Sequence, residues 1–231
     1  MTDHEFTLAS ETLHAMPERT LWWPRTRTLA ASDLHLGKDE GLRAAGAIVP
    51  TGPMQADLDR LSRAIERTDP ERVVIVGDLI HGRLGLKDNV IDRVAAWRDW
   101  HACSFVLVVG NHDRNARGNK LPIALDAWRM DVADPELTID AITFVHDPDD
   151  AKGPSVAGHV HPAVTLGRTK APAFTVLNDV VTLPAFSGFT AGVPIDPRQY
   201  NGVACCCEDA VIGLFETEEA KTSRGGGVSP P

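Results

Sequence analysis

Two uninterrupted apolar runs, at 73–76 and 105–109, constrain the fold of this chain more than any other part of its sequence. The first reads Val-Val-Ile-Val, and a β-branched run of this kind predicts a strand that is buried on both faces of its sheet. The second has the same character and leads to the same prediction. Because such strands need cover on both sides, the two runs favour a layered fold.

Helical patterns alternate with these strands. Between 53 and 68, apolar residues recur at spacings of four, three and four, which predicts an amphipathic helix that begins at Pro53. A second helix is predicted from Asp88, its cap, to about residue 101. A further strand is expected at 26–32. The order strand, helix, strand, helix, strand predicts an α/β fold.

From residue 130 onward the helical pattern largely disappears and short strands are expected instead. They are predicted at 141–145, 155–157, 164–166, 174–177, 180–183, 203–207 and 211–215. We expect them to form a second sheet that packs on the first within a single domain over 1–217. The tail, 218–231, has the glycine, serine and proline content of a disordered segment. Residues 1–20 are weakly patterned, and the stretch 37–50 is expected to be a loop.

Composition excludes some classes of protein. The 231 residues contain no run of about 18 apolar residues, so no membrane span is expected. Residues 1–16 lack the basic and apolar regions of a secretory signal. Four cysteines include three adjacent ones at 205–207, a poor start for disulfides, which favours a reduced, cytoplasmic setting. The net charge of −9 argues against attachment to nucleic acid by bulk basicity, although bound divalent cations would reverse the sign locally.

Five segments place polar side chains of the metal-ligand type directly after an apolar, strand-like run. They are Asp33-Leu34-His35, Gly77-Asp78, Gly110-Asn111-His112-Asp113, His146-Asp147 and Gly158-His159-Val160-His161. Positions two apart in an extended chain point to the same side, so Asp33 and His35 can reach one point. Strand ends of an open α/β sheet meet at one edge, where ligands bind. We therefore predict a metal site made of nitrogen and oxygen ligands at this edge.

The number of candidate ligands exceeds what one ion needs. The seven candidates are Asp33, His35, Asp78, Asn111, His146, His159 and His161. Two ions about 3.5–4 Å apart, bridged by one carboxylate, would use all of them and leave room for a bridging hydroxide. Each segment alone has an ordinary structural explanation, such as a Gly-Asp turn, an Asx turn or a surface histidine. Their joint order and spacing favour a site over five coincidences.

These segments, in this order, resemble the calcineurin-like metallophosphoesterase superfamily. The resemblance implies an α/β four-layer sandwich, in which two mixed β-sheets are flanked by helices and the active site lies at the carboxyl ends of the strands. The implied ligands are Asp33, His35 and His161 for one ion, Asn111, His146 and His159 for the other, and Asp78 for both. By the same resemblance His112 is the catalytic histidine. Many members have glycine before the residue that matches His146, whereas this chain has Val145.

Residue 81 separates branches of the superfamily. Phosphoprotein phosphatases carry an aspartate at this point of the Gly-Asp segment, whereas this chain has His81. A histidine here resembles nucleases and related bacterial phosphodiesterases, although an ordinary loop histidine is the alternative. Four longer segments carry a narrower resemblance, to the PdeM family of bacterial ligase-associated DNA damage response endonucleases. They are 33–38, 110–114, 158–162 and 183–192. This resemblance implies a DNA ligase and a helicase as partners in DNA repair.

The resulting hypothesis is a phosphodiesterase or endonuclease that depends on two divalent ions, with Mn²⁺ suited best and Fe or Zn²⁺ as alternatives. A metal-activated hydroxide attacks phosphorus, His112 assists the leaving oxygen, and His81 orients the phosphate or supports His112. Lys38, Arg83 and Arg114 follow ligand segments, where they either contact neighbouring phosphates or remain solvated surface cations.

Two other functions stay open on the sequence. One is the hydrolysis of small nucleotides or phosphomonoesters. The other is a metal-binding repair scaffold without activity, against which the complete ligand set and His112 speak.

Overall fold

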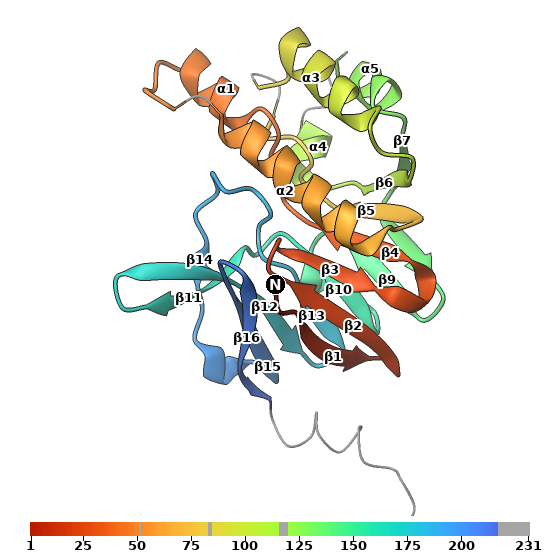
Figure 1. The fold of residues 1–231 in the computed structure, drawn as a ribbon, viewed down its shortest axis with the longest axis vertical. Coiled ribbons are helices and arrows are strands. Elements are labelled where there is room, and N and C mark those ends of the chain that lie inside the picture. The colour runs from red at the N-terminus through yellow and green to blue at the C-terminus, as the bar shows by residue number, and fades with distance from the viewer. Residues whose placement is uncertain (51, 83–84, 116–119, 217–231) are drawn as a thin grey trace, which may run out of the picture.

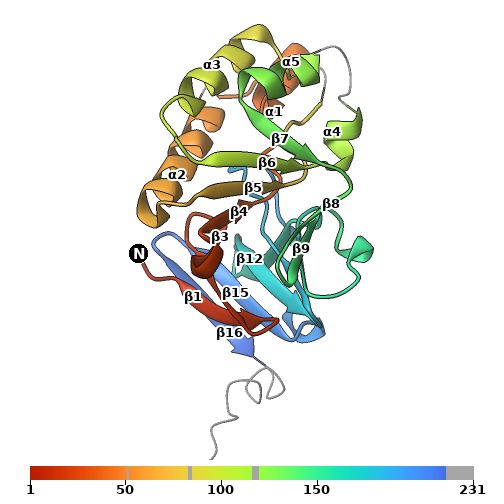
Figure 2. The same cartoon turned by 90° about the vertical axis from the view of Figure 1, so that its right-hand side faces the viewer.

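The computed structural model describes residues 1–50, 52–82, 85–115 and 120–216. Two mixed β-sheets lie face to face, and most of the helices pack on the outer side of the first sheet (Figures 1 and 2). The predicted tail, 218–231, and Arg83 lie outside the described residues. The expectation of a single domain over 1–217 stays a prediction.

The first sheet joins the amino-terminal strands to the predicted α/β strands. Its order is β1 (His4–Leu8), β2 (Glu11–Met16), β3 (Thr20–Trp23), β4 (Thr28–Ala31), β5 (Arg72–Val76), β6 (Ser104–Val108) and β7 (Met130–Ala133). The strands from β1 to β4 pair antiparallel and those from β4 to β7 pair in parallel. The strands predicted at 26–32, 73–76 and 105–109 are confirmed.

The weakly patterned stretch 1–20 proves to form regular strands. Its β1–β2 turn places Ala9 and Ser10 at φ of 51° and 66°, conformations for which glycine or asparagine is the usual signal. In β1 only Phe6 and Leu8 are buried, so the apolar alternation is short. These strands could not be read from the sequence because neither their turn nor their pattern is distinctive.

The connections between the parallel strands form helices. The described α-helices are α1 (Lys38–Ala44), α2 (Pro53–Thr68), α3 (Asp88–Arg98), α4 (Asn111–Asn115) and α5 (Lys120–Ala127). Of these, α2 and α3 confirm the two predicted helices. The loop expected at 37–50 was partly wrong, because α1 forms within it. Arg43 stabilises this helix by pairing with Asp39 and Glu40 at 2.9 and 2.7 Å, one turn earlier.

The second sheet confirms all the short strands predicted after residue 130. Its strands are β8 (Glu136–Ile139), β9 (Ile142–Val145), β10 (Ser155–Ala157), β11 (Pro162–Leu166), β12 (Thr169–Leu177), β13 (Val180–Thr182), β14 (Val193–Pro194), β15 (Gly202–Cys207) and β16 (Ala210–Glu216). The order is β14-β11-β12-β13-β10-β9-β8, and β15 pairs with β12 and β16. The 3₁₀ turns are η1 (Pro24–Thr26), η2 (Pro148–Asp150) and η3 (Pro197–Gln199). Within the described residues no α-helix follows Ala127, so the helical cover lies on one side of the sandwich.

Alternate residues of the central strands face two different cores. In β5, Val74 and Val76 pack between the two sheets, whereas Val73 and Ile75 pack against the helices. This arrangement is the two-sided burial that the Val-Val-Ile-Val run predicted. The predicted fold class, an α/β fold of two mixed sheets flanked by helices, is confirmed.

The adjacent cysteines lie inside β15. Cys206 faces the core between the sheets, whereas Cys205 belongs to a small apolar cluster on the opposite face. All four cysteines are free thiols. Among the described residues, no helix combines the length and the apolar character that crossing a bilayer requires.

Candidate metal centre

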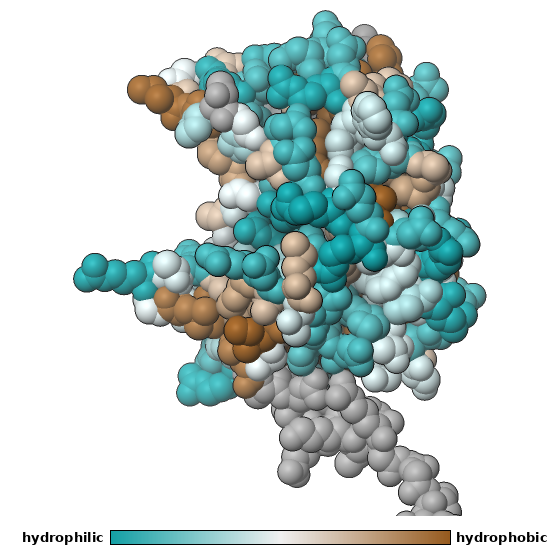
Figure 3. All heavy atoms as spheres, in the orientation of Figure 1, coloured by the Kyte–Doolittle hydropathy of each residue, from teal (hydrophilic) through white to brown (hydrophobic). Residues whose placement is uncertain are grey.

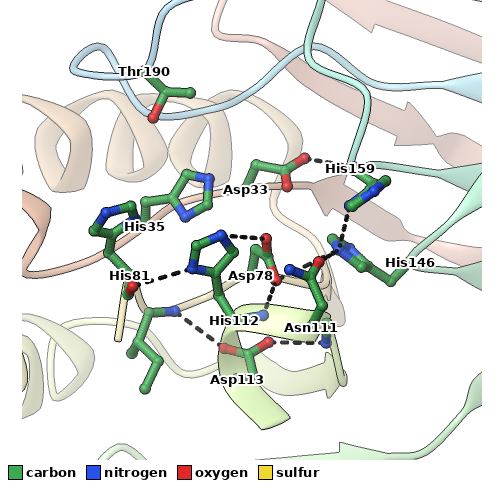
Figure 4. Close-up of polar contacts among 12 residues, drawn as sticks. Asp33, His35, Asp78, His81, Asn111, His112, Asp113, His146, His159 and Thr190 are labelled. Atoms are coloured by element: carbon green, nitrogen blue, oxygen red, sulfur yellow. Dashed lines mark hydrogen bonds and ion pairs between the residues drawn. The ribbon is translucent and has the colours of Figure 1, made fainter. Parts of the chain in front are cut away.

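Polar side chains from both sheets meet at the edge where the parallel strands of the first sheet end (Figure 4). The first sheet contributes Asp33 and His35 after β4, Asp78 and His81 after β5, and Asn111 and His112 after β6. The second sheet contributes His146 after β9, and His159 and His161 between β10 and β11. The structure thus brings all nine sequence-predicted site residues together.

Five of these residues have backbone dihedrals that L-amino acids rarely adopt. The φ angles are 56° at Asp33, 48° at His35, 49° at Asp78, 68° at His159 and 54° at His161. A left-handed conformation of a non-glycine residue costs on the order of 1–3 kcal/mol and is concentrated at functional sites. The chain therefore accepts local strain at the positions that aim these side chains.

Two glycines allow the ligand segments to approach one another. A Cβ atom on Gly77, where φ is 76°, would collide with the His146 ring. A Cβ atom on Gly110 would collide with the carboxylate and the backbone nitrogen of Asp78. Any larger residue at these positions would push the strand ends apart.

Asp33, His35 and His161 form the first of two donor groups. His161 Nε2 lies 3.1 Å from Asp33 Oδ1 and 3.5 Å from His35 Nε2. Burial alone would raise the pKa of Asp33, but the hydrogen bond from His161 and the charges of nearby histidines hold it below its usual value. Burial lowers the pKa of His35 to about 3, so its ring is neutral and able to bind a cation at neutral pH.

Asp78, Asn111, His146 and His159 form the second donor group. His146 Nε2 lies 2.9 Å from Asn111 Oδ1, 3.1 Å from His159 Nδ1 and 3.4 Å from Asp78 Oδ1. His146 therefore sits with the other candidate ligands, although Val145 before it departs from the family pattern.

Neighbouring acceptors orient two of the rings in this group. His146 Nδ1 lies 3.3 Å from the Val76 carbonyl. Because a carbonyl can only accept, Nδ1 carries the proton and Nε2 presents its lone pair to the site. His159 Nε2 lies 3.7 Å from Asp147 Oδ2, which leaves Nδ1 facing the site. The role of Asp147 is one that the sequence did not single out.

His81 and His112 stack beside the two donor groups. Their ring centroids are 5.1 Å apart and their planes are 19° from parallel. His112 Nδ1 donates to the His81 carbonyl at 3.1 Å, and His112 Nε2 lies 3.8 Å from Asp78 Oδ2. The His112 side chain is 37% exposed, so it is accessible from solvent. Burial lowers the pKa of His81 to about 4, so that ring is neutral at neutral pH.

Asp113 holds the two turns of the first sheet together. Its fully buried carboxylate accepts from the backbone N–H groups of Gly110, Ile80 and Leu79 at 3.0, 3.1 and 3.4 Å. These contacts join the turn after β5, which carries Asp78 and His81, to the turn after β6, which carries His112. The sequence placed Asp113 in a candidate segment but assigned it no role. Its signal was only its place in the Asn-His-Asp run.

A model of the calcineurin-like phosphoesterase family matches residues 26–171, more than half of the chain. The chain belongs to this family. The solved structure of the nuclease MPE of Pseudomonas putida is 31% identical to it and covers 92% of this chain and 100% of its own, with a TM-score of 0.79. The family resemblance that the five segments predicted is confirmed.

More distant solved structures are also similar to this calcineurin-like phosphoesterase. The phosphoesterase Yfce of E. coli is 15% identical, with a TM-score of 0.40, and covers 80% of this chain and 90% of its own. A protein of unknown function from Aquifex aeolicus is 16% identical, with a TM-score of 0.41, and covers 58% of this chain and 78% of its own. Among curated proteins, none matches the chain. Family membership and the nuclease relative identify the protein as a phosphoester hydrolase.

The charges at the centre fit the divalent cations that this family binds. Asp33 and Asp78 are 0% and 2% exposed. Burial raises the pKa of Asp78, and the charge of Asp33 raises it further to a smaller extent. The neighbouring His146 acts in the opposite direction, but the net shift is upward. Within the described part of the chain, the ion-pair partners of both carboxylates are histidines alone. Two buried carboxylates without a lysine or arginine partner call for cations, and this nitrogen and oxygen donor set accepts Mn²⁺, Fe or Zn²⁺.

Proposed function

We propose that this protein is a metal-dependent phosphodiesterase that cuts DNA. The observation that carries the proposal is the pair of donor groups at one strand edge, with the stacked His81 and His112 beside them. The relative of 31% identity is a nuclease, which supports a nucleic-acid substrate.

The seven candidate ligands divide between two ions in this proposal. One ion is held by Asp33, His35 and His161, the other by Asn111, His146 and His159, and both by Asp78. The distances within each donor group support the division. The position of Asp78 as the shared ligand is supported by its contact with His146 and by its electrostatic coupling to Asp33.

When bound, two divalent ions supply Lewis-acid chemistry that activates water and neutralises phosphate oxygens. We propose Mn²⁺ as the native ion, with Fe or Zn²⁺ as alternatives. The two donor groups would hold these ions at the edge where the two sheets meet. The rest of the reaction falls to the imidazole pair.

His112 is proposed as the general acid toward the leaving oxygen. Its Nδ1–H is engaged by the His81 carbonyl, so Nε2 is the nitrogen that faces the centre. His112 Nε2 lies 3.8 Å from Asp78 Oδ2, and a proton on this nitrogen would pass to the leaving oxygen. His81 acts as a positioning residue through its carbonyl and its stacked ring. Its buried Nδ1 has no hydrogen-bond partner in the described residues.

The cellular setting is part of the same proposal. The resemblance of 183–192 and the other segments to the PdeM family supports a role in DNA repair, alongside a DNA ligase and a helicase. Four free thiols support a reduced, cytoplasmic compartment.

The test compares a diester with a monoester. Purified protein with added Mn²⁺ should hydrolyse bis-p-nitrophenyl phosphate faster than p-nitrophenyl phosphate, and should linearise circular single-stranded DNA, which has no end for an exonuclease. A preference for the monoester would favour the phosphomonoesterase alternative. Bound metal without hydrolysis of either compound would favour the scaffold alternative. A variant with Asp78→Asn serves as the negative control.

A further inference from the structure

Lys38 is a half-buried cation at the border of the metal centre. Its Nζ donates to Thr190 Oγ1 at 3.0 Å. It lines one small cavity together with His35, Ser187 and Phe189.

Lys38 differs from the cations around it because the described residues provide it with no acidic partner. Arg43 pairs with Asp39 at 2.9 Å, Lys87 with Glu40 at 3.1 Å, and Arg114 with Asp134 at 2.7 Å. Each of those three cations therefore already has a carboxylate partner within the protein. A partly desolvated ammonium that has only a hydroxyl as partner gains most from an external anion.

The segment that carries Thr190 is held firmly in place. Arg19 donates to three successive carbonyls, those of 185–187, at 3.5, 3.4 and 3.2 Å. Buried Asp57 accepts from the backbone N–H of Gly188 at 2.9 Å, and Arg60 donates both to Asp57 and to the Phe186 carbonyl. The backbone N–H of Thr190 donates to the Ser187 carbonyl of this anchored stretch at 3.3 Å, so Thr190 presents a positioned acceptor to the Lys38 ammonium.

The pair of Lys38 and Thr190 lies to one side of His112, the imidazole proposed to serve the reacting phosphate. In Figure 4 Thr190 lies beyond His35 and Asp33, away from His112 and Asn111. The segment runs between α1 and the β11–β14 pair in Figure 1, and Figure 3 shows the surface hollowed on that side of the molecule. A chain that enters the centre has room to continue along this side.

We propose that Lys38, held by Thr190, binds a phosphate of the substrate chain that neighbours the scissile one. This inference rests on the proposed phosphodiesterase function and specifies its substrate class as a polynucleotide. A substrate with a single phosphate leaves Lys38 without a partner, whereas a polynucleotide places the next backbone phosphate within its reach. Arg83, which also follows a ligand segment, lies outside the described residues and is not part of the inference.

The test uses a lysine pair that the chain itself provides. Lys38→Gln removes the charge but keeps a donor for Thr190. Lys170→Gln is the matched control, because exposed Lys170 also hydrogen-bonds to this segment, at the Gly192 carbonyl at 3.3 Å. Cleavage of a short fluorescent oligothymidylate and hydrolysis of bis-p-nitrophenyl phosphate are measured with Mn²⁺ over a series of KCl concentrations, and thermal melting checks the fold.

Lys38→Gln should lower kcat/KM for the oligothymidylate several-fold. It should also reduce the slope of log kcat/KM against log salt by about 0.7, the value for one phosphate contact on a single strand. Hydrolysis of bis-p-nitrophenyl phosphate should stay within twofold of the parent protein. Thr190→Val should give a smaller loss in the same direction, Lys38→Arg should retain most of the rate, and Lys170→Gln should change neither substrate.

Two results would overturn the inference without touching the proposed function. One is an unchanged salt slope and rate on the oligothymidylate in Lys38→Gln. The other is an equal loss on both substrates, which would place Lys38 at the reacting phosphate or the ions. A parent protein that hydrolyses bis-p-nitrophenyl phosphate but no oligothymidylate refutes both the inference and the proposed cutting of DNA, and leaves only the phosphodiester chemistry intact. A parent protein that hydrolyses neither refutes the proposed function itself.

Discussion

Individual histidines of the centre present one nitrogen to the site because the other is engaged elsewhere. His146 Nδ1 is held by the Val76 carbonyl, and His112 Nδ1 by the His81 carbonyl. A ring fixed in this way needs no reorganisation when a cation or a leaving oxygen arrives. At the scale of residues, function therefore depends on local backbone acceptors as much as on the histidines themselves.

Replacing His112 by alanine should separate catalysis from metal binding. Because His112 is proposed to serve the leaving oxygen and not an ion, kcat on bis-p-nitrophenyl phosphate should fall about 100-fold or more. Metal content by elemental analysis should stay at the parent level. His14→Ala, which alters a histidine of β2 outside the centre, is the control. Loss of metal along with rate would refute the assigned role.

Asp78→Asn tests the shared ligand. The change keeps the shape of the side chain but removes the negative charge on which both ions are expected to depend. Both equivalents of metal and nearly all activity should be lost, whereas Asp131→Asn, an exposed site on β7, should change neither. Retention of one full equivalent of metal would show that Asp78 serves a single ion.

At the scale of elements, the turn between β6 and α4 has no space for a side chain at residue 110. In Gly110→Ala the new methyl group would meet the Asp78 carboxylate and backbone. This variant should lose metal affinity and activity. Gly153→Ala is the matched control, because a Cβ atom there meets nothing within 4 Å. Equal metal content in the two variants would argue against a tightly packed centre.

Asp113 links the turns after β5 and β6, and its removal should loosen both. In Asp113→Ala three buried backbone N–H groups lose their acceptor. We expect the free energy of unfolding, measured by urea titration, to fall by at least about 1–3 kcal/mol, the cost of one buried unsatisfied group. The rate should fall as well, because His112 and Asp78 lose their relative position. A stable variant with parental activity would show that the link is dispensable.

The titration of Asp113 gives a pH-dependent prediction. Burial raises its pKa from 3.8 to about 6. Between pH 3.8 and about pH 6, the folded protein therefore binds more protons than the unfolded chain. Because of this group, the free energy of unfolding falls as the pH rises through that window. The asparagine of Asp113→Asn cannot ionise, so the free energy of unfolding of this variant should fall less over the same pH window than that of the parent protein. Unfolding curves of metal-free parent and variant at several pH values check this, and identical pH profiles would contradict it.

At the scale of the whole molecule, the centre lies where the two sheets meet. Asp33 comes from the first sheet and His161 from the second, so an ion held by both would link them. Metal binding to the folded state alone stabilises it by about 2.7 kcal/mol when the ion is at 100 times its Kd. The melting temperature should therefore rise with Mn²⁺ concentration and return to its starting value with EDTA. The rise should be absent in Asp78→Asn, and a melting temperature insensitive to Mn²⁺ in the parent would refute the site.

Much of the fold could be read from the sequence because its central strands and helices have strong periodic patterns. The Val-Val-Ile-Val run predicted two-sided burial, and the spacing of apolar residues predicted α2 within its observed bounds. By contrast, β1 and β2 depend on a turn at Ala9 and Ser10 that no usual turn residue marks, and α1 depends on ion pairs of Arg43. Those elements are decided by local geometry and contacts that a pattern of apolar residues does not contain.

The sequence by itself determined the chemistry of the centre, because residue types and their places after strand-like runs are enough to predict carboxylate, amide and imidazole donors at one edge. The tertiary structure alone decided which nitrogen of His146 and of His112 faces inward, and that Asp113 and Asp147 support the donors. It also decided that Lys38 meets Thr190 across 152 positions of the chain. These features depend on distances between residues far apart in the chain, and such distances exist only once the two sheets have packed.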